Sequence, residues 1–297
     1  MKVRCLLTFL ILIILVNSIK AFNPNHLKVL LTTDPVDYWQ KWRKQNPYIK
    51  PDLSDSEINN CSFQGDFSNV NLLRAKIIGG GMIPPILFIN SNLNYSTIAN
   101  IEVMMLSMSN DKAVFKNTTF NKAKILNSSI LGADFYKVNF DESYIDKTKI
   151  MSSKFKDISF SNSMIIQSII EGDFMNVNFS KCQLKETIIL VSFIGKMFNV
   201  NFKYARILKC GISGDLQKID FQNSDITGTS FDYRKGGSTF TNVNFSNANL
   251  TNVDFTRATF QNVIFKNADM TGAKLERKWY SYVKKQGVRN FDKIQWM

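Results

Sequence analysis

The sequence predicts an all-β solenoid, in which the chain turns a corner every five residues and the resulting square coils stack along one axis. Two observations predict this fold. Large apolar residues recur at every fifth position over most of the 297 residues, and a small or β-branched residue stands two positions before each. Proline, which interrupts backbone hydrogen bonding, does not occur after Pro85.

The five-residue period fits neither the 3.6-residue period of a helix nor the two-residue period of a flat strand. Strand alternation places the large residue and the small residue two positions earlier on the same, inward side. Four such sides close one coil of about 20 residues, and roughly ten coils at ~4.8 Å spacing give a rod near 50 Å long. The predicted core residues are Phe115, Phe120, Phe135, Phe140, Phe155, Phe160, Phe240, Phe245, Leu250, Phe255, Phe260 and Phe265.

A longer phrase, F-x-N-V-N-F-x-x-A-x-L, recurs in variants about once per coil, for example from Phe135, Phe155, Phe240 and Phe260. The sequence therefore resembles the pentapeptide-repeat family, whose consensus is A-(D/N)-L-x-x, although it uses Phe and Ile where Leu is commonest. The resemblance covers about residues 51–277. It implies a right-handed quadrilateral β-helix, a pentapeptide-repeat solenoid with short helical caps at both ends. It also implies that a homodimer could form through the C-terminal element.

Residues 1–21 have the layout of a secretory signal peptide, with a short basic start and an apolar run over Leu6–Val16. That run is shorter than the roughly 20 residues of a membrane-spanning helix, which makes an uncleaved anchor the weaker alternative. Cleavage is expected between Ala21 and Phe22, or earlier, after Ser18. The mature chain is then secreted or periplasmic and does not span a membrane.

The two ends of the solenoid are predicted to be capped by short helices. Residues 22–50 form the N-terminal cap, in which Trp39 and Trp42 share one helix face after Pro35. Residues 51–275 form the solenoid, and residues 276–297 form a C-terminal capping helix over Glu276–Gln286 and a tail. All four tryptophans lie outside the repeats, because a narrow interior has no room for an indole while open ends need covering.

The five-residue phase breaks at four places, where surface loops are expected: Gly79–Phe88, Met104–Lys112, Ile188–Lys196 and Asp232–Gly237. Loops carry function more often than coils do. The last break contains Tyr233, Arg234 and Lys235, a basic and aromatic candidate binding loop. The alternative is a solvated turn beside two glycines.

Nothing in the sequence predicts an enzyme, so no catalytic, cofactor-binding or metal-binding residue is assigned. The only histidine is His26, which excludes His-dependent catalysis within the repeats. Cys61, Cys182 and Cys210 each stand two positions before an apolar core residue, the position of a buried structural cysteine. A polysaccharide-acting carboxylate pair, known in some β-solenoids, is the remaining enzymatic alternative.

The net charge of +13, or +10 without Lys2, Arg4 and Lys20, decides between the functional classes that the resemblance offers. Some pentapeptide-repeat proteins are acidic rods that mimic DNA and inhibit gyrase. A basic rod cannot copy a phosphate lattice, and no nucleic-acid partner is expected. The sequence favours a non-enzymatic exported binding or scaffold module whose partner is a protein or an anionic envelope or host surface. The alternative is a secreted effector of an intracellular bacterium that binds a host protein.

Lysines that recur along the rod would form a charged stripe for such a partner. The central coils hold nine candidates: Lys112, Lys116, Lys122, Lys124, Lys137, Lys147, Lys149, Lys154 and Lys156.

Overall fold

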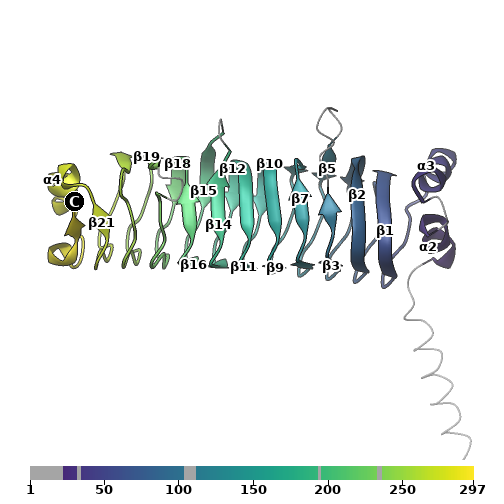
Figure 1. Ribbon diagram of the computed structural model, residues 1–297, viewed down its shortest axis with the longest axis horizontal. Helices are drawn as coiled ribbons and strands as arrows, with labels where there is room; N and C mark the ends of the chain where they lie inside the picture. The colour runs from purple at the N-terminus through teal and green to yellow at the C-terminus, as the bar shows by residue number, and fades with distance from the viewer. Residues whose placement is uncertain (1–22, 32–34, 104–111, 193–194, 233–235) are drawn as a thin grey trace, which may run out of the picture.

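The computed structural model describes residues 23–31, 35–103, 112–192, 195–232 and 236–297. These residues form one elongated parallel β-solenoid with short helices at its two ends (Figure 1). The N-terminal helices and the C-terminal cap lie at opposite ends of the rod, as the colours of Figure 1 show. The predicted all-β solenoid with helical caps is therefore confirmed.

Most strands are short because each covers one side of a coil, while the longer strands continue over two adjoining sides or, in β2, over three. They are β1 (Glu57–Asp66), β2 (Lys76–Ile89), β3 (Thr97–Ala99), β4 (Glu102–Val103), β5 (Ala113–Lys116), β6 (Lys124–Leu126), β7 (Ser129–Leu131), β8 (Asp134–Tyr136), β9 (Tyr144–Asp146), β10 (Lys149–Ser159), β11 (Met164–Ile166), β12 (Ile169–Asn178), β13 (Gln183–Lys185), β14 (Ile188–Val191), β15 (Met197–Asn201), β16 (Arg206–Leu208), β17 (Gly211–Ser213), β18 (Asp215–Asp220), β19 (Thr239–Thr241), β20 (Thr259–Gln261), β21 (Lys274–Leu275) and β22 (Gln295–Trp296).

Parallel pairing between coils arranges the inward residues in four rows, which define four sides of the solenoid. Side 1 holds Phe67, Phe88, Phe115, Phe135, Phe155, Phe174, Met197, Leu216, Phe240 and Phe260. Side 2 holds Leu53, Leu72, Leu93, Phe120, Phe140, Phe160, Phe179, Phe202, Phe221, Phe245 and Phe265. Side 3 holds Ile58, Ile77, Ile98, Ile125, Ile145, Ile165, Leu184, Ile207, Ile226, Leu250 and Met270. Side 4 holds Phe63, Met82, Val103, Ile130, Ile150, Ile170, Ile189, Ile212, Phe231, Phe255 and Leu275. The twelve predicted core residues all lie in these rows and are buried.

Aromatic stacking along the axis holds neighbouring coils together. On side 2 an unbroken column of phenylalanines runs from Phe120 to Phe265, and most neighbouring ring centroids lie 4.8–4.9 Å apart. Each buried ring contributes roughly 1.5–3 kcal/mol through removal from water, and each ring pair about 0.5–1.5 kcal/mol more. No coil can bury its own edges, so this stabilisation depends on stacking.

The corners explain why asparagine is frequent. At most corners the second residue after the inward residue has a left-handed backbone, as at Asn117 (φ 49°), Asn127 (φ 48°) and Asn252 (φ 56°). Asparagine tolerates this conformation better than other residues with a Cβ atom. On side 2 an asparagine often precedes the inward residue as well, as at Asn71, Asn92 and Asn139. There its side chain accepts a hydrogen bond from the backbone two residues on, as Asn92 does from Asn94 at 3.1 Å.

Two helices close the N-terminal end, α2 (Pro24–Leu30) and α3 (Pro35–Gln45). The Trp39 indole is fully buried and stacks on Phe67 at a centroid distance of 4.7 Å, so it lies where the next side 1 ring would lie. Its Nε1 donates a hydrogen bond to the Asp66 carbonyl oxygen at 2.9 Å. The tryptophan therefore covers the exposed end of both the aromatic column and the backbone ladder.

The C-terminal cap differs from the single helix that the sequence predicts over Glu276–Gln286. A 3-10 turn (Arg277–Trp279) leads into the short helix α4 (Tyr280–Lys284), and the chain then returns to pair β22 with β21. The Tyr282 hydroxyl and the Gln286 amide reach back to the open backbone of the last full coil, at Val263 and Phe265. Side chains here satisfy hydrogen bonds that another coil would otherwise make.

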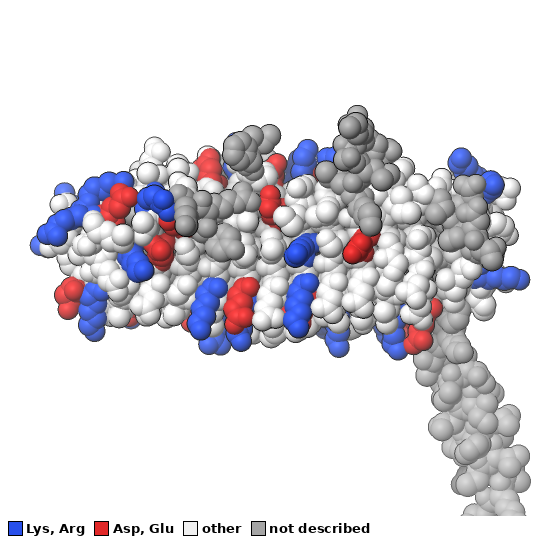
Figure 2. Space-filling model, in the orientation of Figure 1, with Lys and Arg blue, Asp and Glu red and all other residues white. Residues whose placement is uncertain are grey.

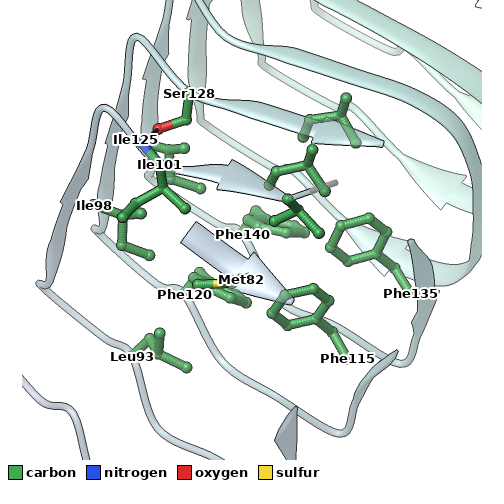
Figure 3. Close-up of a pocket in the computed structure, with 13 residues that line it drawn as sticks. Met82, Leu93, Ile98, Ile101, Phe115, Phe120, Ile125, Ser128, Phe135 and Phe140 are labelled. Atoms are coloured by element: carbon green, nitrogen blue, oxygen red, sulfur yellow. Dashed lines mark hydrogen bonds between the residues drawn. The ribbon is translucent and has the colours of Figure 1, made fainter. Parts of the chain in front are cut away.

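Figure 3 shows a small apolar gap in the interior of the solenoid. The rings of Phe115 and Phe135 lie on one side of this gap, and Ile98 and Ile125 lie on another. It holds about 20 Å³, little more than one water molecule, and Ser128 is its one polar lining residue. The gap is therefore a packing defect beside the short Val103 side chain and offers no ligand site.

Candidate anion-binding surface

All variation in coil length falls at one of the four corners. From one inward residue to the next, the step is always five residues from side 1 to side 2, from side 2 to side 3 and from side 3 to side 4. From side 4 to side 1 it varies: Phe231 to Phe240 takes nine residues, whereas Ile170 to Phe174 takes four. We call this the variable corner. It marks sides 4 and 1 as the sides that differ from coil to coil.

The four predicted loops all fall at the variable corner, with different outcomes. Gly79–Phe88 is not a loop, because β2 continues through it and its backbone pairs with β1, β4 and β5. Met104–Lys112 and Ile188–Lys196 each include residues outside the described part of the chain. The candidate binding residues Tyr233, Arg234 and Lys235 also lie outside it, so their role stays a prediction.

The nine central lysines do not share one side. Lys124 projects from side 3 and Lys149 from side 4, whereas Lys122 and Lys147 occupy corners. The other five gather on side 1 and at its corner with side 2: Lys112, Lys116, Lys137, Lys154 and Lys156. The structure therefore concentrates the predicted stripe on β5, β8 and β10.

The centre of this group is a short row in exact register along the axis. Tyr136 on β8 pairs with Lys116 on β5 on one side and with Lys156 on β10 on the other. Lys137 follows at the adjoining corner. We call these four residues the lysine strip. Its three lysines are exposed, and none forms an ion pair with another described residue.

Two aspartates border the lysine strip, and each already has a hydrogen-bonding partner. Asp134 receives the Lys112 ammonium at 3.3 Å, whereas Asp157 accepts a hydrogen bond from the Asn176 amide at 2.8 Å. Burial and the nearby Asp134 carboxylate raise the pKa of the Tyr136 hydroxyl, which therefore stays neutral at physiological pH. Five lysines against two aspartates leave three unbalanced positive charges on this side of the central coils.

The strip surrounds a shallow depression of about 340 Å³, lined by its four residues together with Val114 and Asp157. The depression thus offers three ammonium groups, one aromatic ring, one apolar contact and one carboxylate. This combination can hold an anionic group and its neighbouring hydroxyls.

Lys137 occupies a corner where its backbone is left-handed, with φ 52°. Such a conformation costs a residue with a Cβ atom about 1 kcal/mol, and asparagine or glycine relieves much of that cost. Other corner lysines, such as Lys122, Lys147 and Lys181, have the same left-handed backbone, so this cost belongs to the corners of the solenoid in general.

Side 4 has a different surface. Its outward residues here are mostly apolar: Leu131, Met151, Ile169 and Ile188 are half-buried, and Leu190 is buried. Figure 2 looks onto this side, whose middle carries only scattered charged side chains, whereas basic and acidic side chains stand beside one another along the lower edge over β3, β9, β11 and β16. Charged side chains are thus unevenly placed around the rod.

Among the described residues, no cluster of histidine, cysteine and carboxylate side chains could hold a metal ion. The cysteines are buried and unpaired, and burial raises the pKa of the Cys182 thiol to about 12 and of Cys61 and Cys210 to about 11. The sole histidine, His26, accepts a hydrogen bond from the Asp52 backbone within the N-terminal cap.

Comparison with known families agrees with this architecture. Residues 238–277 match the family model of pentapeptide repeats in eight copies, and they cover two uninterrupted coils in which every step is five residues. The chain contains pentapeptide repeats. Outside the matched region the pentapeptide-repeat solenoid keeps the same four rows, but its phase is reset at the variable corner.

Solved structures with likeness to this pentapeptide-repeat solenoid are distant. HetL, a pentapeptide repeat protein involved in heterocyst differentiation regulation in the cyanobacterium Nostoc sp., is 12% identical with a TM-score of 0.32, and the match covers 78% of this chain and 94% of HetL. Full-length QnrB1, a plasmid-mediated fluoroquinolone resistance protein, is 16% identical with a TM-score of 0.25, covering 65% and 97%. A pentapeptide repeat protein of the Arabidopsis thaliana thylakoid lumen is 12% identical with a TM-score of 0.17, covering 68% and 81%. No curated protein matches the sequence.

The lysine strip could have been predicted from the sequence. Lys116, Tyr136 and Lys156 stand 20 residues apart, and Asn117, Lys137 and Asp157 follow one position later. Coils of 20 residues in this stretch place such positions directly above one another. Sorting the nine lysines by this spacing, and not by their density along the chain, would have separated the strip from the rest.

Proposed function

We propose that this protein is a non-enzymatic, exported binding module that holds an anionic partner at the lysine strip. The observation that carries the proposal is the register of Lys116, Tyr136 and Lys156, with Lys137 beside them. Their ammonium groups point outward without an ion-pairing partner among the described residues. The strip also lies on a side that borders the variable corner, where the coils depart from simple repetition.

Binding at such a strip needs several contacts at once. One exposed ion pair contributes about 0–1 kcal/mol, and physiological salt screens exposed charges over about 8 Å. Coils about 4.8 Å apart place Lys137 within that distance of Lys116 and of Lys156, which are themselves separated by about 9.6 Å. A partner with several negative charges therefore gains from all of them, and its affinity falls steeply as salt increases.

The non-enzymatic part of the proposal rests on the sequence, whose only histidine is His26, outside the repeats.

Export rests on the predicted signal peptide, which lies with Ala21 and Phe22 outside the described residues. No helix within the described part of the chain is long and apolar enough to cross a membrane. We expect protein recovered from cells to lack residues 1 to about 21. Mass spectrometry decides this, and an intact Met1 on exported protein would contradict it.

Co-sedimentation tests the binding proposal. The purified protein is mixed with vesicles of anionic or neutral phospholipid, and with acidic or neutral polysaccharide, at low and physiological salt. We expect binding to at least one anionic probe, little binding to its neutral counterpart, and a loss of binding as salt rises. Equal binding to neutral and anionic probes, or no dependence on salt, would rule the proposal out. Absence of any binding would turn attention to a protein partner, for which the apolar outward residues of side 4 are the available surface.

A further inference from the structure

The depression at the lysine strip contains more than positive charge. Asp157 lies among its lining residues, directly after Lys156 in the sequence and one coil along the axis from Lys137. A carboxylate there weakens the binding of an isolated phosphate or sulfate, because it repels the same charge that the lysines attract. A carboxylate also accepts hydrogen bonds, so its presence favours a ligand with hydroxyl groups beside its anionic groups.

Tyr136 sets a second requirement for the ligand, which is a face that can pack against an aromatic ring. Its ring is only half-exposed, its neighbours along the axis are lysine side chains, and Val114 lies in the same depression. Aromatic faces at binding sites pack against the apolar C–H face of a sugar ring or against a planar base. A bilayer surface is flat and would meet the rim of the depression before its floor.

The spacing of the lysines sets a third requirement for the ligand, which concerns the distance between its negative groups. Lys116 and Lys156 are separated by two coil steps, about 9.6 Å, along the rod axis. A linear chain that carries one negative group on every second unit can meet both lysines while the uncharged unit between them lies over Tyr136.

We propose, as a refinement that rests on the proposed function, that the partner is an acidic polysaccharide whose chain runs along the rod axis across the lysine strip. Its carboxylate or sulfate groups pair with Lys116, Lys137 and Lys156. An uncharged sugar packs on Tyr136, and one of its hydroxyl groups donates a hydrogen bond to Asp157. The strip covers three coils, so it accommodates only a short stretch of the chain.

Hyaluronan oligosaccharides of increasing length test this refinement, because they carry one carboxylate on each disaccharide. The neutral control is an N-acetylchitooligosaccharide of equal length. We expect affinity for the purified protein to rise up to about four to six sugars and then to level off, because the strip ends after two coil steps. An affinity that rises with every added disaccharide would instead indicate contact with the whole basic rod, and would overturn the refinement.

Matched variants locate the site. Tyr136→Ala should weaken binding roughly threefold to tenfold through loss of the ring contact. Tyr144→Ala removes a half-buried tyrosine from side 3 of the same coil and should leave binding unchanged. Equal effects of the two variants would contradict the placement.

Substitution of Asp157 should have opposite effects on the binding of a simple anion and on the binding of an acidic sugar chain. Asp157→Asn removes a negative charge, so it should strengthen the binding of inorganic sulfate or anionic vesicles. For the hexasaccharide we expect weaker binding, since a charge-assisted hydrogen bond exceeds the repulsion relieved at an exposed site. Asp146→Asn, on side 3, is the control for the change in net charge. Stronger hexasaccharide binding by Asp157→Asn would contradict the role given to this carboxylate.

Reductive methylation of lysines gives a readout independent of affinity. The hexasaccharide should protect Lys116, Lys137 and Lys156, while Lys124 and Lys149 on the neighbouring sides remain reactive. Uniform protection, or none, would overturn the placement.

The outcomes separate the two proposals. If none of the oligosaccharides binds but anionic vesicles bind in a salt-dependent way, the polysaccharide refinement is rejected and the proposed function still holds. Binding of single-stranded nucleic acid that depends on Tyr136, without binding of oligosaccharide, would also reject the refinement. If no anionic probe binds, both the refinement and the proposed function are rejected.

Discussion

The C-terminal coils, residues 238–277, and the central coils, residues 112–157, have the same inward pattern and different outward residues. On side 1 of the C-terminal coils the outward residues are the neutral polar side chains Thr239, Thr241, Thr259 and Gln261. At the equivalent positions the central coils hold Val114, Lys116, Asp134, Tyr136, Lys154 and Lys156. The inward row determines the fold in both regions, so the outward positions are free to differ, and we locate the function where they do.

The largest expected effect is on the free energy of unfolding and concerns the inward phenylalanines, which the two regions share. Phe160 lies in the centre of the side 2 column, 4.8 Å from Phe140 and from Phe179. Phe160→Ala should destabilise the protein by about 3–5 kcal/mol, measured by urea unfolding followed by circular dichroism. Phe260→Ala should cost about 3 kcal/mol, the low end, because Phe260 is 7% exposed and faces the cap through Trp279. A cost under about 1 kcal/mol for either would argue against a continuous core.

A second expected effect concerns the corners. Two residues inserted after Gly132, at the variable corner, should cost less than about 1 kcal/mol, because a longer surface loop adds little closure entropy. The same insertion after Asn127, between sides 3 and 4 of that coil, should cost about 3 kcal/mol or more, because it moves inward residues out of register. Both variants are compared by urea midpoint. Equal tolerance at the two corners would contradict a special role for the variable corner.

A smaller effect sharpens the contrast between stability and function. Lys137 and Lys147 both have left-handed backbones, with φ 52° and 49°. Replacing either by Asn should raise stability by about 0.5 kcal/mol, because Asn fits this conformation better. Only Lys137→Asn should also weaken anion binding. Stabilisation without loss of binding at Lys137 would place the partner elsewhere on the rod.

The smallest expected effect concerns the cysteines, which occupy the small inward position of the repeat. Because burial raises the pKa of the Cys182 thiol to about 12, this thiol should not react with a disulfide reagent at pH 8 in the folded protein. The folded state keeps its thiol protons to higher pH than the unfolded chain does. Stability should therefore be complete below the ordinary thiol pKa and decline as pH rises through it towards 11. Rapid labelling of folded protein at pH 8 would show that the coils open.

The sequence predicted the core because three of the four steps in every coil are five residues long, so one inward residue on side 1 locates the next three. It failed at Gly79–Phe88, where a six-residue step from Met82 to Phe88 is absorbed within β2 and forms no loop. It also failed to sort the lysines, because a residue's side depends on counting coils and not on local density. The C-terminal helix was overpredicted because Tyr282 and Gln286 face the last coil through hydrogen bonds that periodicity does not reveal.

Removal of matched sets of lysines tests the central claim most directly. Lys116, Lys137 and Lys156 are changed to Gln in one variant, and Lys124, Lys147 and Lys149 in another. Each set has two lysines on sheet faces and one at a corner, and each removes three positive charges from the same region. We predict that, at low salt, the first variant loses binding to the anionic probe by roughly tenfold or more, whereas the second changes it by less than about threefold. Equal losses would show that net charge alone attracts the partner, and would contradict a binding site on side 1.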